Sequence, residues 1–273
     1  MTTFVLVHGA FSCAAHWGPV ARGLALRGHR AVAVDLPGHG LDARVPVGDH
    51  ATAPSGMVGR STAGDVAAVL EVLRAAREHG PVVLVGHSRG GLTITACANA
   101  APELVDHLVY VSAWCCAAGG PSAYQGIPEA ASDLDHLLPR LVVTDPAALG
   151  AIRVAWIQDA PRLLTDLQGA LLADGSRDQL LAMLRAMDDD ETLAIDEDAV
   201  RVHPAAWGRV PHTYVRLTAD RVMPVALQDR FVADADAAVP DNPFRVVDIP
   251  TSHLGVQVHP DPLVERLVGL LAG

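Results

Sequence analysis

Short apolar runs alternate with helical patterns along this chain. Six runs are rich in β-branched and other apolar residues, and they predict strands over residues 3–7, 30–34, 82–85, 107–111, 212–217 and 244–249. The clearest helix is predicted over residues 62–79, with Thr62 and Asp65 as a capping box and Gly80 at its end. A final helix is predicted over residues 262–271. This alternation is typical of a mostly parallel sheet, here six-stranded, with helices on both faces.

The alternation of strands and helices breaks after Trp114. Residues 114–206 contain helical patterns and no convincing strand, with helices starting at Asp145-Pro146 and covering residues 161–173 and 176–187. About ninety residues are too many for a plain loop. Because the segment follows the fourth strand, we predict a helical lid over the carboxyl edge of the sheet, where ligands bind in open α/β sheets. The alternative is a helical subdomain that only adds stability.

The predicted organisation is therefore a core of residues 1–113 and 207–273 and a lid of residues 114–206. Within the lid, the acidic run over residues 188–191 is expected to be a solvated turn rather than a metal site.

Composition narrows the class of protein. The chain has 273 residues, of which 50% are apolar, so a sizeable core is expected. No apolar run approaches the ~20 residues of a membrane span, and no signal-peptide pattern is present, so we expect a cytoplasmic protein. The net charge of −11 argues against nucleic acid and anionic membranes as partners. The pattern does not indicate an oligomeric state.

Two residue types exclude further chemistries. The chain contains no lysine, which excludes Schiff-base catalysis, pyridoxal phosphate attachment and a P-loop lysine, and no cofactor is expected. The cysteines lack the spacing of a CxxC motif and are expected to be reduced thiols; they are Cys13, Cys97, Cys115 and Cys116. A metal site is the less favoured alternative for them, and none is expected.

The strongest functional motif is Gly86-His87-Ser88-Arg89-Gly90. A serine hydroxyl attacks well when a sharp turn between a strand and a helix holds it forward, and glycines two positions away on either side prevent collisions there. Here an apolar strand precedes the motif and a helical pattern follows it. We therefore predict Ser88 as a nucleophile. A glycine-rich phosphate loop is the alternative, and the absence of lysine disfavours it.

Two backbone N–H groups are predicted to stabilise the oxyanion of a tetrahedral intermediate. One belongs to Arg89, at the start of the helix after the nucleophile, and the other to Ala10 in the loop after the first strand. Gly9 lets the backbone of that loop approach the substrate. His8 precedes the serine, whereas the order nucleophile, acid, base is typical of such a turn, so His8 is interpreted as structural. The Arg89 side chain is expected either to contact an acidic substrate or to lie at the surface.

The acid and the base are predicted just beyond the last two strands. Asp220 follows the strand over residues 212–217 and is the candidate acid, and His253 follows the next strand and is the candidate base. His259 is the nearby competitor for the role of base, and it lies closer to the final helix. Asp35 follows the second strand and is expected to organise its loop rather than to catalyse.

These motifs resemble the methylesterase and hydroxynitrile-lyase branch of the α/β-hydrolase superfamily, over nearly the whole chain. The resemblance is carried by residues 4–10, Trp17, residues 86–91, Thr218-Ala219-Asp220 with Met223-Pro224, and Ser252-His253. It implies the α/β-hydrolase fold and the same triad of Ser88, Asp220 and His253.

Three positions depart from the family pattern. Ser12 stands where a histidine is usual, Gly9 where the lyases carry threonine or asparagine, and Leu254 where the S-selective lyases carry lysine. Cyanohydrin cleavage needs a hydroxyl and a cation at the last two positions, so these departures favour ester hydrolysis. Substrate contacts are expected from Gly9, Phe11, Trp114 and Leu254.

The function predicted from the sequence is that of a serine hydrolase without a cofactor. Its substrate is expected to be a small to medium, largely apolar carboxylic ester, such as a methyl ester or a lactone. Two alternatives remain: a lyase or carbon–carbon-bond hydrolase that uses the same triad, and a ligand receptor that keeps the fold for binding. Turnover of nitrophenyl acyl esters would distinguish an esterase from the receptor.

Overall fold

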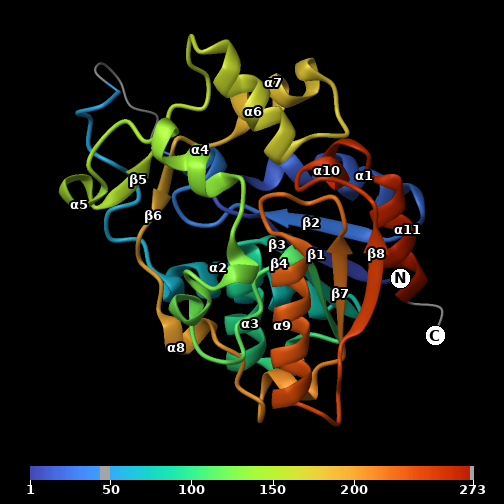
Figure 1. Ribbon diagram of the computed structural model, residues 1–273. Coiled ribbons are helices and arrows are strands. Elements are labelled where there is room, and N and C mark those ends of the chain that lie inside the picture. The colour runs from blue at the N-terminus through green and yellow to red at the C-terminus, as the bar shows by residue number, and fades with distance from the viewer. Residues whose placement is uncertain (44–49, 271–273) are drawn as a thin grey trace.

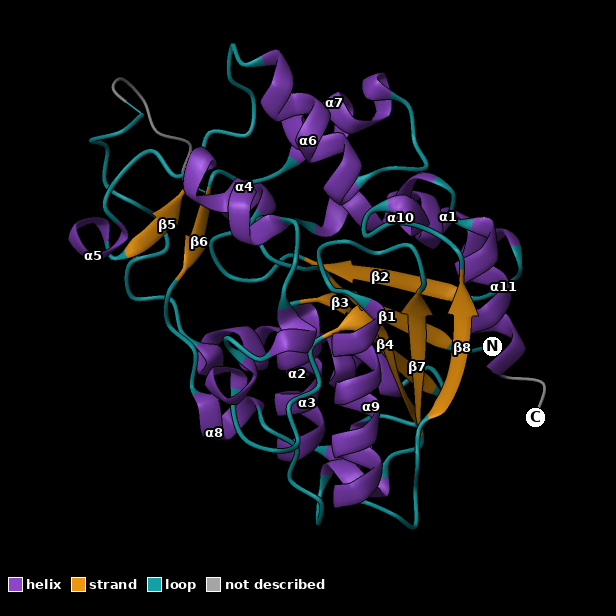
Figure 2. Ribbon diagram, in the orientation of Figure 1, coloured by secondary structure: helices purple, strands orange, loops and turns teal. Residues whose placement is uncertain are grey.

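The computed structural model describes residues 1–43 and 50–270. Within these residues, six strands form one sheet in the order β2-β1-β3-β4-β7-β8, and every neighbouring pair is parallel. The strands are β1 (Thr3–Val7), β2 (Arg30–Val34), β3 (Val82–Ser88), β4 (His107–Ala113), β7 (His212–Leu217) and β8 (Arg245–Ile249). All six predicted strands are confirmed and are drawn in orange in Figure 2. β3 and β4 extend further toward their carboxyl ends than predicted.

Helices cover both faces of this sheet (Figure 1). One face is covered by α1 (Gly18–Leu26) and α11 (Asp261–Gly269), and the other by α2 (Thr62–Arg77), α3 (Gly90–Ala100) and α9 (Val225–Ala238). Phe4 and Leu6 of β1 point toward the face that α1 and α11 cover, and Val5 and Val7 point toward the face that α2, α3 and α9 cover. Successive strand residues face opposite sides, and both sides are covered, so the strands read as continuous apolar runs.

The cap of α2 differs from the one predicted. Ser61, rather than Thr62, is the N-cap residue, and its hydroxyl accepts a hydrogen bond from the Gly64 N–H at 3.3 Å. The Thr62 hydroxyl instead accepts a hydrogen bond from the Asp196 N–H at 2.9 Å. The predicted capping box of Thr62 and Asp65 is therefore wrong, because the preceding hydroxyl reaches the free N–H groups of the first turn.

Residues 114–206 are called here the inserted segment. Its residues 134–186 lie beyond the carboxyl ends of β7 and β8, toward which their arrows point in Figure 1, whereas residues 197–200 pack beside α3. Its helices are α4 (Leu134–Leu141), α5 (Pro146–Leu149), α6 (Pro161–Leu171), α7 (Arg177–Ala186) and α8 (Glu197–Val200). The segment also contains two short antiparallel strands, β5 (Ala151–Arg153) and β6 (Asp190–Thr192). The prediction that it contains no strand is therefore wrong.

The acidic run over residues 188–191 is not a solvated turn, because Asp190 and Glu191 are buried in β6. Arg153 of β5 is fully buried, and its Nε and Nη2 atoms lie 2.6 and 2.7 Å from the two oxygens of Asp190. Its Nη1 donates to the carbonyl oxygens of His50 and Ala53, at 2.7 and 2.6 Å. A buried charge requires a partner with hydrogen bonds, and here the partner comes from a neighbouring strand.

The remaining short helices lie at turns. They are η1 (Ala14–Trp17), η2 (Gly40–Asp42), η3 (Pro102–Leu104), η4 (Pro121–Tyr124), η5 (Pro128–Ala130), η6 (Trp207–Arg209) and α10 (Gly255–Val258). The helix predicted over residues 262–271 corresponds to α11, and residue 271 lies outside the described residues. Among residues 1–43 and 50–270, no helix is long and apolar enough to span a bilayer. The four cysteines are all buried and free, as the sequence predicts.

Candidate active site

Ser88 stands at the carboxyl end of β3, on the turn into α3. Its φ of 54° lies in the left-handed region, which a residue other than glycine keeps only when its surroundings hold it there. A Cβ at Gly86 would lie 2.8 Å from the Gly90 carbonyl oxygen, and a Cβ at Gly90 would lie 2.6 Å from that of His8. The close approach of the backbone therefore requires glycine on both sides of this strained serine.

Asp220 and His253 follow β7 and β8, at the same edge of the sheet as Ser88. His253 Nδ1 lies 2.6 Å from Asp220 Oδ2, and both side chains are buried. The two competing residues lie elsewhere. Asp35 accepts a hydrogen bond from the Ala14 N–H at 2.6 Å, and the exposed His259 has its Nε2 3.3 Å from the carbonyl oxygen of Asp174.

Several donors hold the Asp220 carboxylate. The N–H groups of Val222 and Met223 both donate to Oδ1 at 2.8 Å, and the Ser112 hydroxyl donates to Oδ2 at 2.7 Å. Burial alone would raise the pKa of Asp220, but the charge of His253 and these hydrogen bonds lower it. The ionised carboxylate keeps the proton of a neutral His253 on Nδ1, which leaves Nε2 as the atom that can accept a proton.

Ser112 is a contact of Asp220 that the sequence did not predict. It has a φ of 38° near the end of β4, one strand away from Ser88. A hydroxyl residue that ends an apolar strand at the edge carrying the nucleophile is the signal that could have indicated it.

His87 connects the nucleophile turn to the loop that carries His253. Its Nε2 lies 3.0 Å from the His253 carbonyl oxygen, and because a carbonyl only accepts, this nitrogen carries the proton. Burial and the neighbouring His253 lower the pKa of His87 to about 3, so its ring is neutral. The residue before Ser88 thus anchors the backbone of the histidine loop.

The loop after β1 packs directly on the nucleophile. A Cβ at Gly9 would lie 2.9 Å from the Ser88 Cβ, so a larger residue would collide there. His8 is a structural residue of this loop: its Nδ1 donates to the Gly9 carbonyl at 2.8 Å, and its Nε2 accepts from the Leu36 N–H at 3.1 Å. Burial lowers the pKa of His8 to about 3.

The Arg89 side chain does not lie at the surface. It is 13% exposed, and its Nη1 lies 3.9 Å from Asp65 Oδ2 and 3.7 Å from Glu191 Oε1. Burial raises the pKa of Asp65 to about 6, despite the opposing charge of Arg89. The guanidinium therefore faces two carboxyl groups of the protein itself.

A pocket of about 850 Å³ is lined by Ser88, Ala10 and Arg89, and by residues of the inserted segment that begin with Trp114. Most of these lining side chains are apolar, including Leu92, Leu134 and Leu138. That the segment acts as a lid, and that Trp114 contacts substrate, stay predictions.

Three residues expected to contact substrate are not among those that line this pocket. Gly9 packs on Ser88. Phe11 and Leu254 are buried in an apolar cluster with side chains of α4, α6 and α7. Their loops turn these two side chains under the inserted helices, which the sequence pattern could not indicate.

The inserted segment holds the histidine loop. The Asp174 carboxylate accepts hydrogen bonds from the hydroxyls of Thr251 and Ser252, and from the Ser252 N–H at 3.3 Å. The Leu254 N–H donates to the Leu171 carbonyl at 2.9 Å. Asp174 is a second contact that the sequence did not suggest, since it follows a helix far from His253 in the chain.

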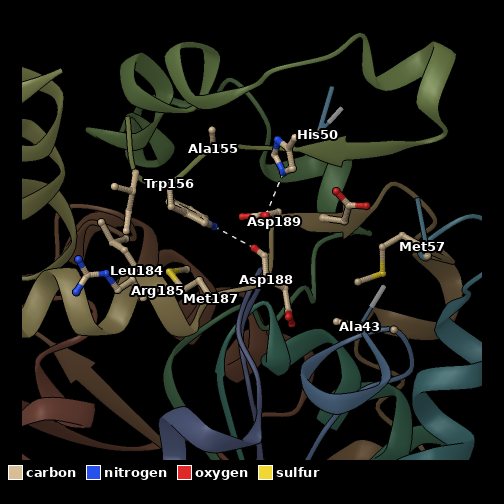
Figure 3. Close-up of a pocket in the computed structure, with 14 residues that line it drawn as sticks. Ala43, His50, Met57, Ala155, Trp156, Leu184, Arg185, Met187, Asp188 and Asp189 are labelled. Carbon is tan, nitrogen blue, oxygen red and sulfur yellow. Dashed lines mark hydrogen bonds and ion pairs between the residues drawn. The ribbon is translucent and has the colours of Figure 1, made fainter. Parts of the chain in front are cut away.

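A second cavity, of about 440 Å³, lies between the inserted segment and side chains that include His50 and Met57 (Figure 3). His50 Nε2 lies 3.0 Å from Asp189 Oδ2, and Trp156 Nε1 donates to the Asp188 carbonyl at 3.0 Å. This second cavity shares no lining residue with the pocket beside Ser88, so the two cavities are separate.

A parallel sheet with a strained serine turn at its carboxyl edge is the architecture of the α/β-hydrolases. The model of the alpha/beta hydrolase family matches residues 4–266, and the chain belongs to this family.

Individual relatives show which branch of this family the chain is similar to. A pyrethroid hydrolase of Sphingobium wenxiniae is 27% identical over 98% of this chain and 86% of that protein. An alpha-hydroxynitrile lyase and methylesterase 10, both of Arabidopsis thaliana, are each 32% identical over 41% of this chain, covering 39% and 37% of their own lengths. The crystal structure of polyneuridine aldehyde esterase matches with a TM-score of 0.76 at 19% identity, over 99% of both chains, which shows the shared fold. The predicted branch is confirmed, and its members among the homologues include esterases, a hydrolase and a lyase.

Proposed function

We propose that this chain is a serine esterase with Ser88 as nucleophile, His253 as base and Asp220 as acid. The observation that carries the proposal is the buried contact of 2.6 Å between His253 Nδ1 and Asp220 Oδ2, at the sheet edge where Ser88 occupies a strained turn. A hydroxyl, an imidazole and an oriented carboxylate are the groups that acyl transfer requires.

In the proposed reaction, Ser88 Oγ attacks the ester carbonyl while His253 Nε2 takes its proton. The N–H groups of Ala10 and Arg89 hold the oxyanion, and Asp220 stabilises the imidazolium. The leaving alcohol takes the proton from His253 as the tetrahedral intermediate collapses to an acyl-enzyme. Water then attacks the acyl-enzyme in the same way, and the acid is released. The sequence of steps needs no cofactor.

The proposed substrate is a small to medium, largely apolar carboxylic ester, such as a methyl ester or a lactone. A mostly apolar pocket of about 850 Å³ next to Ser88 supports this substrate class. The named activities of the relatives, methylesterase and pyrethroid hydrolase, also support an ester. We further propose a cytoplasmic location, which the four free cysteines support.

The test is turnover of nitrophenyl acyl esters by the wild type and by Ser88→Ala. Loss of the nucleophile should lower kcat by on the order of 10⁴ to 10⁶. A fluorophosphonate probe should label Ser88 in the wild type and nothing in the variant. Unchanged turnover in the folded variant, or labelling of another serine, would refute the assignment.

The similarity to an alpha-hydroxynitrile lyase makes cyanohydrin cleavage the second candidate on the same triad. Gly9 and Leu254 disfavour it, because no hydroxyl or cation stands at either position. The Cβ contact at Gly9 also opposes a larger residue there. A missing charge-assisted contact to the departing anion costs about 1.5–3 kcal/mol, or roughly one to two decades in rate. Aryl esters should turn over while mandelonitrile cleavage stays at background, and comparable cyanide release would favour the lyase.

A further inference from the structure

The loop that carries Ala10 is held in a strained conformation. Phe11, the next residue, has a φ of 55°, although it is not glycine. Such a conformation persists only when surrounding contacts over-determine it. The Phe11 N–H is part of the peptide that joins Ala10 to Phe11, so contacts that fix Phe11 restrain the backbone on the carboxyl side of Ala10 and limit the orientations open to the Ala10 N–H.

Both backbone polar groups of Phe11 are bound by the inserted segment. Its N–H donates to Glu191 Oε2 at 2.9 Å, and its carbonyl accepts from the Asp188 N–H at 2.9 Å. Asp188 is itself fixed, since its carbonyl accepts from Trp156 Nε1 at 3.0 Å (Figure 3) and its carboxylate accepts from the Gly40 N–H at 3.0 Å. The strained residue is thus held between two residues of one short segment.

Glu191 also faces the second half of the proposed oxyanion hole. Its Oε1 lies 3.7 Å from Arg89 Nη1 and accepts a hydrogen bond from the Thr192 N–H at 2.8 Å. Its Oε2 lies 3.3 Å from His39 Nε2. Burial alone would raise the pKa of Glu191, but Arg89, His39 and the Phe11 N–H together lower it to about 2. Glu191 is therefore a buried anion placed between the two loops that carry Ala10 and Arg89.

We propose that Glu191 is a positioning residue for the oxyanion hole. It fixes Phe11 by a hydrogen bond and Arg89 by charge, and so aligns the N–H groups of Ala10 and Arg89 on one point. The inference rests on the proposed function. Glu191 does not line the pocket beside Ser88, so it acts through these neighbours and not on the substrate.

The test compares the wild type with Glu191→Gln and Glu191→Ala. The glutamine can still accept from the Phe11 N–H but loses the charge that faces Arg89, whereas the alanine loses both contacts. Displacement of an oxyanion donor costs about 10²-fold in rate. We expect kcat for a nitrophenyl ester to fall about tenfold in Glu191→Gln and about 10²-fold in Glu191→Ala, with KM within about threefold of the wild type.

A tetrahedral analogue separates positioning from a general loss of structure. The affinity for an aryl trifluoromethyl ketone, which forms an oxyanion on Ser88, should fall across the three proteins in proportion to kcat. Asp189→Ala is the matched control, because Asp189 is on the same segment and its carboxylate contacts His50 instead. Its kcat and its affinity for the ketone should stay within about twofold of the wild type.

Three results would overturn the inference. One is a kcat of Glu191→Ala within threefold of the wild type, and another is a fall in kcat with unchanged affinity for the ketone. The third applies if Glu191→Ala does not fold: a kcat and a ketone affinity of Glu191→Gln equal to those of the wild type would then show that Glu191 does not position the oxyanion hole. Retained turnover in Ser88→Ala would instead contradict the proposed function itself, so the two failures are distinguishable.

Discussion

The parallel-sheet core and the inserted segment are stabilised by different kinds of contact. β1, in the core, is a run of five buried residues that pack apolar side chains on both faces. β6, in the inserted segment, is also fully buried, yet its residues are Asp190, Glu191 and Thr192. Its carboxylates are balanced by Arg153, Arg89 and His39. The burial of apolar side chains, which has no preferred direction, therefore stabilises the core, whereas specific charge pairs hold part of the inserted segment.

The difference matters for the candidate site. The core carries Ser88, Asp220 and His253, each at the end of a strand. The inserted segment supplies Glu191 against the strained Phe11 and Asp174 against Thr251 and Ser252. Changes to the first group should stop the chemistry even in a folded variant, whereas changes to the second should alter stability and site geometry together.

The largest effect is expected at the base. His253→Ala should lower kcat for a nitrophenyl ester by about 10⁴-fold or more, while the matched variant His259→Ala keeps most of the activity. The kcat of Asp220→Asn should fall by about 10⁴-fold, because the amide no longer holds His253 in the required tautomer. In the wild type, kcat/KM should fall at acid pH, since a protonated imidazole cannot accept the serine proton. Loss of activity in His259→Ala alone would reverse the assignment.

The next largest effect is expected at the buried pair of β5 and β6. Arg153→Ala leaves Asp190 buried without its partner and should lower the free energy of unfolding by about 3–5 kcal/mol. Arg140→Ala is the control in the same segment, because Arg140 pairs with Asp166 at 2.9 Å with both side chains nearly half exposed. That exposed pair should contribute about 0–1 kcal/mol. Urea denaturation measures both, and equal losses would show that burial does not distinguish the two pairs.

Glu191 should give a pH dependence of stability in acid. Its pKa falls from 4.5 to about 2 on folding, so its stabilising contribution is complete above about pH 4.5 and is lost as the pH falls toward 2. A shift of this size corresponds to about 3 kcal/mol. The charged groups that face it, Arg89 and His39, are both cationic in this range, and a raised pKa of His39 favours its protonation. Between pH 4.5 and 2, unfolding titrations of the wild type should therefore lose about 3 kcal/mol more than those of Glu191→Gln. Parallel curves for the two proteins would contradict the pairing.

The smallest effect is expected at the contact between the inserted segment and the histidine loop. Asp174 is exposed, so its hydrogen bonds to Thr251 and Ser252 compete with water. Asp174→Ala should cost about 1–2 kcal/mol of stability. A several-fold fall in kcat should accompany this, because the loop that bears His253 loosens. Asp159→Ala, at another exposed carboxylate of the same segment, should change neither quantity, and identical behaviour of the two variants would show that Asp174 does not hold the loop.

The sequence by itself determined the sheet and the three candidate catalytic residues. Strands of a covered parallel sheet are continuous apolar runs, and functional groups of this fold follow the strand ends, so Ser88, Asp220 and His253 could be found from local pattern and chain order. The glycines around Ser88 added a steric requirement that is also local.

Only the tertiary structure decided which distant polar groups meet. Glu191 and Phe11 are 180 residues apart, Ser112 and Asp220 are 108 apart, and Asp174 and Thr251 are 77 apart. A local pattern predicts that an acidic residue is exposed to solvent, because burying its charge costs much free energy unless a specific partner is present. The acidic run over residues 188–191 was therefore expected in solvent, whereas Arg153, Arg89 and His39 make its burial possible. That pairing depends on how the inserted segment packs against the core, which no periodicity within a single segment encodes.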